Sequence, residues 1–262
     1  MSHLLTERQG HLLIVTLNRP EARNAFSPEM LVGMADAWDE ADANPDIRAV
    51  VLTGAGGSFC SGADLKAMND NVNQSDSARR FREDTGLAWK ALLRDHFLSK
   101  PLVAAVEGYA VAGGTEILQA TDIRVAGESA VFGVVEVTRG LFPLGGSTVR
   151  LRRQIGFTKA MELLLMGETL TAREAQECGL IGRVVPDGEA LDEAIRLAER
   201  IAANAPLAVQ AVKRSVRETE GLTETEALKV ELGIGMPIFQ TKDAKEGTLA
   251  FKEKRPPAYT GE

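Results

Sequence analysis

The sequence predicts an α/β fold in which strands, glycine-rich loops and helices alternate along the first part of the chain. Three apolar runs support this prediction: HLLIVTLN at 11–18, AVVL at 49–52 and PLVAAV at 101–106. Short runs of this kind, rich in β-branched residues and bounded by turn residues, are typical of buried strands. Glycines follow two of them, at Gly54 and Gly108. The repeated order of strand, glycine loop and helix indicates the α/β class.

Helix-start patterns define the intervening elements. Ser27 is a favourable N-cap and Pro28 a favourable first helical residue, so we expect a helix there that ends before Pro45. We expect another helix over about 85–97 and short strands at 121–126 and 130–132. Residues 69–85 are polar and lack an apolar pattern, which predicts a mobile loop or a loose helix.

Helices dominate the sequence from residue 158 onward. Thr171 with Glu174 and Thr223 with Glu226 form two capping boxes, each of which marks a helix start. We also expect helices over 188–203 and 206–219, and a last helix that ends at the prolines 256–257. We therefore divide the chain into a catalytic core, residues 1–200, and a C-terminal helical region, residues 201–262.

Composition excludes several classes of protein. The chain has 262 residues with 44% hydrophobic and 26% charged residues, ordinary values for a globular protein, and a net charge of −7. No basic stripe suggests nucleic-acid binding. The two cysteines and three histidines are scattered, which predicts neither a disulfide framework nor a metal site. No run of 18 apolar residues and no signal peptide is recognisable, so we expect a cytoplasmic protein without a membrane partner.

Two segments rich in small residues are candidate ligand sites: SFCSGADLK at 58–66 and GYAVAGGTE at 108–116. Small residues allow a ligand to approach the backbone closely. The second segment precedes a helix expected to start near Thr115, and free N–H groups at a helix start can stabilise a developing oxyanion. Taken alone, each loop is equally consistent with a tight turn. Glu116 could be a solvated residue of a first helical turn, and Glu136 a surface acid.

Four motifs in a fixed order carry a resemblance to a known family. GSFCSGADL, KPLVAAVEGYAVAGGTE, TDIRVAGESAVFGVVEV and GLFPLGGS together resemble the crotonase (enoyl-CoA hydratase/isomerase) superfamily. The similarity extends from RPEARNAFS near the N-terminus to AFKEKRPP near the C-terminus. The resemblance implies a crotonase-like spiral of repeated ββα units whose C-terminal helical extension assembles homotrimers or homohexamers. It also implies an acyl-CoA thioester as substrate.

The resemblance also assigns catalytic roles by position. The backbone N–H groups of Ala63 and Gly113 would form an oxyanion hole for the thioester oxygen. Glu116 would act mainly on the attacking water and Glu136 mainly on the α-carbon, two roles that need carboxyls of different pKa. Family members with other activities often lack one of these glutamates, so the presence of both predicts a hydratase.

The resemblance places further residues beside the substrate: Ser61, Asp64, Leu65, Lys66, Gly114, Val135 and Leu141. Lys66 matches a position that can approach the CoA phosphates. No metal and no redox cofactor is needed, because coenzyme A belongs to the substrate. The chain departs from the family pattern at Val134 and Val135, where many hydratases have Gln-Pro. This departure leaves the acyl group open: the apolar Val134, Val135, Leu141 and Phe142 would suit a long or bulky chain, or they are ordinary core residues.

The leading hypothesis is therefore an enoyl-CoA hydratase of fatty-acid β-oxidation or a related acyl-CoA degradation. A Δ3-Δ2-enoyl-CoA isomerase or another enzyme of the same fold is the first alternative. A non-catalytic acyl-CoA-binding protein is the second.

Overall fold

The computed structural model describes residues 2–64 and 75–262 and has a mixed α/β architecture. Its strands are β1 (Leu4–Gln9), β2 (Leu12–Leu17), β3 (Ala49–Gly54), β4 (Leu102–Val106), β5 (Tyr109–Val111), β6 (Ile123–Gly127), β7 (Val131–Gly133), β8 (Thr169–Thr171) and β9 (Arg183–Val185). Its longer helices are α1 (Pro28–Ala43), α3 (Asp76–Glu83), α6 (Ser147–Gln154), α7 (Phe157–Met166), α9 (Ala190–Ala202), α10 (Pro206–Glu218), α11 (Glu224–Gly235) and α12 (Lys242–Glu253). The shorter ones are η1 (Pro20–Ala22), α4 (Leu87–Ala91), α5 (Gly113–Leu118), η2 (Glu136–Arg139), α8 (Ala172–Glu177) and η3 (Met236–Gln240). The predicted α/β class is confirmed.

Two sheets organise the described part of the chain. The larger has the order β1-β2-β3-β4-β6-β9, in which β1 pairs antiparallel with β2 and every other neighbouring pair is parallel. The smaller has the order β5-β7-β8, with β5 parallel and β8 antiparallel to β7. Because β5 follows β4 after two residues, the chain passes from the large sheet to the small one at Gly108.

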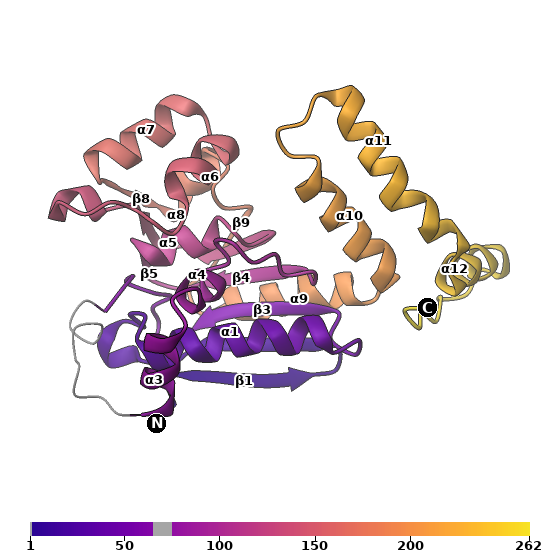
Figure 1. The fold of residues 1–262 in the computed structure, drawn as a ribbon, viewed down its shortest axis with the longest axis horizontal. Helices are drawn as coiled ribbons and strands as arrows, with labels where there is room; N and C mark the ends of the chain where they lie inside the picture. The colour runs from indigo at the N-terminus through magenta and orange to yellow at the C-terminus, as the bar shows by residue number, and fades with distance from the viewer. Residues whose placement is uncertain (1, 65–74) are drawn as a thin grey trace.

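Helices cover both faces of the large sheet. Alternate residues of a strand point to opposite faces, and β2 divides its side chains accordingly. Leu13 and Val15 belong to the same buried cluster as α1, whereas Leu12 and Ile14 pack with the alanine-rich side of α9. Figure 1 shows α1 along one side of the sheet and α9 behind it. The apolar runs of the strands are thus buried on both faces.

The C-terminal helices stand apart from this body. In Figure 1, α10, α11 and α12, coloured orange to yellow, project to the right of the sheets. Helix α11 has no buried residue in the single chain, and Leu228 and Leu232 are 55% and 62% exposed. The expected change from an α/β core to helices is therefore visible in this region. The boundary at residue 200 stays a prediction.

Local rules predicted several helix starts. Ser27 caps α1 by accepting a hydrogen bond from the N–H of Met30, and Pro28 is its first residue. Thr171 and Thr223 form reciprocal capping boxes with Glu174 and Glu226.

Other boundaries differ from the predictions. The helix expected over 85–97 is limited to α4 (Leu87–Ala91), because Leu93 adopts a left-handed conformation with φ 51°. Strands β1, β5, β8 and β9 and helix α6 were not predicted. Part of the polar stretch expected to be a loop or loose helix forms α3 (Asp76–Glu83), and its residues 69–74 lie outside the described range.

Candidate active site

The loop that follows β3 presents the backbone of Ala63. Phe26 holds this loop through two backbone hydrogen bonds: its N–H donates to the carbonyl of Gly62 over 2.8 Å, and its carbonyl accepts from Asp64 over 3.0 Å. Ala63 itself is exposed. Its N–H has no hydrogen-bond acceptor among the residues that the structure describes. The local pairing therefore fixes Ala63 and leaves its N–H available to a ligand.

A second free N–H comes from the start of α5. Gly113 is the first residue of this helix, and within the described chain its N–H also lacks an acceptor. The two loops touch, since a Cβ on Gly62 would lie 2.8 Å from the Cβ of Ala112 and 3.1 Å from the nitrogen of Gly113. Glycine at position 62 is thus needed for this close approach. Two adjacent free N–H groups can stabilise an oxygen that gains negative charge during a reaction.

Ala112, the residue before Gly113, has a strained backbone. Its φ of 51° and ψ of −127° are unusual for a residue with a side chain. Several hydrogen bonds hold it there: its N–H donates to Gly133, and its carbonyl accepts from Thr115 and Glu116. Strain of this kind persists only where the surroundings impose it, and it often accompanies functional sites. Here it sets the direction of the first peptide of α5.

Glu116 lies in the first turn of α5, and each of its carboxylate oxygens accepts a backbone hydrogen bond. The residue is only 4% exposed. The N–H of Gly145 donates to its Oε2 over 3.0 Å, and the N–H of Ser147 donates to its Oε1 over 3.2 Å. Glycine is required at position 145, because a Cβ there would lie 2.7 Å from Oε2 of Glu116. Backbone N–H donors on two sides therefore fix the position of the carboxylate.

Glu136 occupies the opposite kind of environment. It begins η2, directly after the small sheet, and its Oε2 is buried without a hydrogen-bond partner in the described part of the chain. Burial raises the pKa of Glu136 to about 7, its own backbone N–H opposes this effect, and the charge of Glu116 adds to the increase. The side chain is therefore a carboxylic acid that can keep its proton near neutral pH.

The two glutamates have contrasting surroundings. N–H donors hold both carboxylate oxygens of Glu116. Burial raises the pKa of Glu136, and the charge of Glu116 contributes to that increase. Such a pair can remove a proton from one reacting atom and deliver a proton to another.

The residues predicted to contact substrate have different local roles. Asp64 forms an ion pair with Arg19 at 2.9 Å, which ties the Ala63 loop to the segment before η1. The Ser61 hydroxyl donates to the carbonyl of Ala22 over 3.3 Å. A Cβ on Gly114 would lie 2.3 Å from the carbonyl oxygen of Cys60. These contacts explain the residue types through the packing of the loops, and the substrate contacts themselves stay predictions.

The remaining predicted contacts lie near Glu136 or outside the described range. Val135 is half-buried directly before Glu136. Leu141 is 45% exposed, and its N–H donates to the carbonyl of Glu136. Leu65 and Lys66 fall within residues 65–74, which the structure does not describe.

Sequence reasoning missed the two donors that hold Glu116. Gly145 and Ser147 lie 29 and 31 residues after it, so no local pattern connects them. The paired glycines of GLFPLGGS were the available indication, since glycines before a helix often mark a close backbone approach.

No group of three or more His, Cys, Asp or Glu side chains that could hold a metal ion occurs in residues 2–64 and 75–262. None of the helices in those ranges has the length and apolar character needed to span a membrane.

Comparison with known proteins gives concordant matches over the whole chain. The sequence model of the Enoyl-CoA hydratase/isomerase family matches residues 7–262. Enoyl-CoA hydratase EchA19 of Mycobacterium tuberculosis is 57% identical over 257 residues, which cover 97% of this chain and 95% of that protein. The 2,3-dehydroadipyl-CoA hydratase of Escherichia coli is 37% identical over 261 residues, which cover 100% of both. The crystal structure of enoyl-CoA hydratase EchA1 from Mycobacterium marinum has a TM-score of 0.91, 44% identity, and coverage of 100% of both chains.

Proposed function

The chain belongs to the enoyl-CoA hydratase/isomerase family, and from this premise we propose that it is an enoyl-CoA hydratase. It would add water across the double bond of a 2-enoyl-CoA and release a 3-hydroxyacyl-CoA. The observation that carries the proposal is the contrast between Glu116, whose carboxylate is bound by two N–H donors, and Glu136, whose pKa burial raises to about 7.

The proposed mechanism begins at the thioester carbonyl. Its oxygen accepts hydrogen bonds from the N–H groups of Ala63 and Gly113, which stabilise the negative charge of an enolate. The Glu116 carboxylate takes a proton from water as the water oxygen bonds to the β-carbon. The electrons of the double bond move toward the thioester, and Glu136 delivers its proton to the α-carbon. One proton is taken and one is given, so the sum is the addition of water.

After this step the two carboxyls have exchanged protonation states. Glu116 holds the proton of the water, and Glu136 is ionised. The starting state returns when Glu116 releases a proton and Glu136 gains one, for which the solvent is sufficient. No electrons are transferred to or from the protein, so we propose that no cofactor takes part and that coenzyme A acts only as a part of the substrate.

The acyl chain would extend along the apolar residues that follow Glu136. Leu141 and Phe142 are 45% and 63% exposed although both are large and apolar. We propose that they contact a long or bulky acyl group. A panel of 2-enoyl-CoA thioesters of increasing length, including steroid side-chain thioesters, tests this, since a preference for the shortest chain would contradict it.

Product analysis tests the reaction class. The purified chain is incubated with crotonyl-CoA, the loss of the conjugated double bond is followed by absorbance, and the product is identified by mass spectrometry. A gain of one water mass is the expected result. A 3-enoyl-CoA converted without gain of mass would indicate an isomerase, and no turnover of any enoyl-CoA would favour a binding protein.

We further propose assembly into trimers or hexamers through α10–α12, which leave large apolar side chains exposed in the single chain. A cytoplasmic location and a role in fatty-acid β-oxidation or a related degradation are proposals of the same kind, supported by the sequence and the family.

A further inference from the structure

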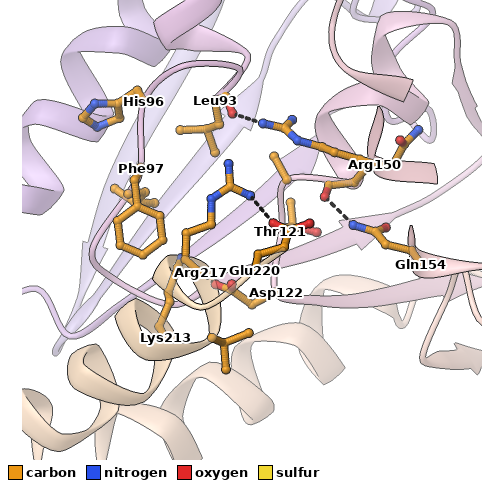
Figure 2. Close-up of a pocket in the computed structure, with 14 residues that line it drawn as sticks. Leu93, His96, Phe97, Thr121, Asp122, Arg150, Gln154, Lys213, Arg217 and Glu220 are labelled. Carbon is orange, nitrogen blue, oxygen red and sulfur yellow. Dashed lines mark hydrogen bonds and ion pairs between the residues drawn. The ribbon is translucent and has the colours of Figure 1, made fainter. Parts of the chain in front are cut away.

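Arg150, on α6, is a buried cation with an unusual set of partners. It is only 9% exposed, and its Nη2 donates to the carbonyl of Leu93 over 2.5 Å and to that of Arg94 over 3.3 Å. Its Nη1 is buried without a partner in the described chain, and no carboxylate there lies at ion-pair distance. Figure 2 shows the guanidinium directed at Leu93 from the wall of a cavity of about 270 Å³. A buried guanidinium bound only to carbonyl oxygens is costly and calls for an explanation.

The other charged side chains of this cavity do not explain why Arg150 is buried without a carboxylate partner. Lys213 pairs with Asp122 at 2.7 Å, and Arg217 lies 3.6 Å from Glu220. Figure 2 shows Lys213 and Arg217 extending from α10 into the cavity. The acids of the cavity are thus already paired with its other cations. The role of Arg150 must therefore lie in its contacts toward the turn that contains Gly145 and Ser147, the donors to Glu116.

A chain of hydrogen bonds leads from Arg150 to that segment. Arg94, whose carbonyl Arg150 binds, donates its own Nε to the carbonyl of Leu144 over 2.8 Å. The next N–H, of Gly145, donates to Glu116. The backbone N–H of Arg150 donates to Gly146 over 2.9 Å. The last bond belongs to the first turn of α6 and does not involve the Arg150 side chain. The side chain acts through Arg94, which anchors the carbonyl of Leu144 directly before the first Glu116 donor.

Arg150 and Glu116 also interact electrostatically. Burial lowers the pKa of Arg150, nearby Arg217 lowers it further, and the negative charges of Glu116 and Glu220 oppose both effects. Arg94 is a further unfavourable neighbour. A Cβ on Gly146 would lie 3.4 Å from Nη1, so this nitrogen borders the backbone between the two donors to Glu116.

We propose that Arg150 is a positioning residue for Glu116. Its guanidinium fixes the turn at Leu93 and Arg94, Arg94 fixes the carbonyl of Leu144, and the N–H groups of Gly145 and Ser147 thereby stay directed at the Glu116 carboxylate. The inference rests on the proposed role of Glu116 in activating water.

The test is a double-mutant cycle on the full-length protein with crotonyl-CoA. Arg150→Met keeps much of the side-chain volume without the charge, and we expect kcat to fall about 10²-fold, the scale of a small misplacement of a catalytic group, with KM changed less than about threefold. In a Glu116→Gln background the same substitution should lower kcat less than about threefold further, because its effect passes through the carboxylate.

Two more variants separate positioning from folding. Arg150→Lys restores a positive charge and a donor for the carbonyl oxygens of Leu93 and Arg94, so it should recover part of kcat. Arg94→Ala changes a side chain whose hydrogen bond to Leu144 is exposed, and it should lower kcat about tenfold, again only when Glu116 is present. Arg173→Ala, which removes an exposed arginine of α8, is the matched control and should leave kcat unchanged.

The outcomes test the positioning role of Arg150 separately from the proposed hydratase function. Equal losses from Arg150→Met and Arg94→Ala in both backgrounds would overturn the inference, as would full activity of Arg94→Ala. If Arg150→Met does not fold, the cycle of Arg94→Ala with Glu116→Gln decides alone. A near-wild-type Glu116→Gln would instead contradict the proposed function.

Discussion

Glu116 and Glu136 differ in what surrounds their oxygen atoms. The oxygens of Glu116 each accept a backbone hydrogen bond, whereas Oε2 of Glu136 is buried without a partner in the described chain. Hydrogen bonds to a carboxylate favour its charged form, and burial without them favours the neutral form. The division of acid and base roles that we propose therefore rests on local environment, since the two side chains are chemically identical.

The first residue-scale prediction concerns pH. Because burial raises the pKa of Glu136 to about 7, its acid form is present below that pH and lost as pH rises through it. We therefore expect the kcat/KM for hydration to fall above about pH 7, on a limb that Glu136→Gln abolishes. A profile of the wild type that stays flat from pH 6 to pH 9 would remove Glu136 as the proton donor.

A second residue-scale prediction concerns Ala63. If its N–H holds the thioester oxygen, Ala63→Gly should keep most activity, while Ala63→Pro removes the donor. Losing one such donor typically lowers kcat by about 10²–10³-fold. Circular dichroism, melting temperature and CoA binding verify that the proline variant is folded. A folded Ala63→Pro with a rate within a few-fold of wild type would show that Ala63 is not part of the oxyanion hole.

At the scale of elements, the site forms where short segments meet at the ends of strands and helices. The loop after β3, the start of α5, the start of η2 and the turn before α6 each contribute a donor or a carboxyl. Close backbone approach between these segments explains their glycines. Gly145 is the case that involves a proposed catalytic group, because a Cβ there would lie 2.7 Å from Oε2 of Glu116.

The corresponding prediction uses a pair of glycine variants. In Gly145→Ala the new methyl group would lie 2.7 Å from Oε2 of Glu116, so the carboxylate must move. A displaced catalytic group lowers kcat, here by about tenfold to a hundredfold. Gly156→Ala is the control, since a Cβ there meets no atom within 4 Å. Steady-state kinetics of the two variants provide the check, and equal activity would mean that the turn does not position Glu116.

Sequence patterns predicted those features that depend on neighbouring residues. Ser27, Thr171 and Thr223 cap helices because their hydroxyls reach an N–H three residues away. The end of α4 could not be predicted, because it depends on the left-handed Leu93, whose carbonyl is bound by Arg150 from α6. The two N–H donors to Glu116, from Gly145 and Ser147, could not be predicted either, because they are also distant in sequence from the residue that they contact.

The candidate site was predictable only in part. The family resemblance identified both glutamates and both glycine-rich loops by their motifs. The raised pKa of Glu136 depends on its burial by residues that are distant in sequence. A sequence motif contains no information on that burial. The ion pair of Asp64 with Arg19 likewise joins segments 45 residues apart.

At the scale of the whole molecule, the C-terminal helices from α10 onward expose apolar side chains that nothing covers in a single chain. Val212, Val216, Leu232 and Phe239 are large apolar residues of α10–η3 that are each more than half exposed. Contiguous exposed apolar surface of this kind usually marks an interface. The proposed trimer or hexamer would cover it.

The prediction at this scale is loss of assembly. Charged residues in an apolar interface are strongly unfavourable, so the double variant Leu228→Glu, Leu232→Glu should shift the protein from trimer or hexamer to monomer. Leu5→Glu, at a comparably exposed leucine of β1, serves as the control and should leave assembly intact. Light scattering coupled to size exclusion measures the mass, and a monomeric wild type would contradict the proposed assembly.

The most direct test of the central claim is the rate of crotonyl-CoA hydration in Glu116→Gln, Glu136→Gln and the double variant. Each single substitution should lower kcat by roughly 10²–10⁴-fold, the usual contribution of a general acid or base. The double variant should lose far less than the product of the two, because the carboxyls act as a unit. Binding of a saturated acyl-CoA should change little. Near-wild-type hydration by either single variant would contradict the account.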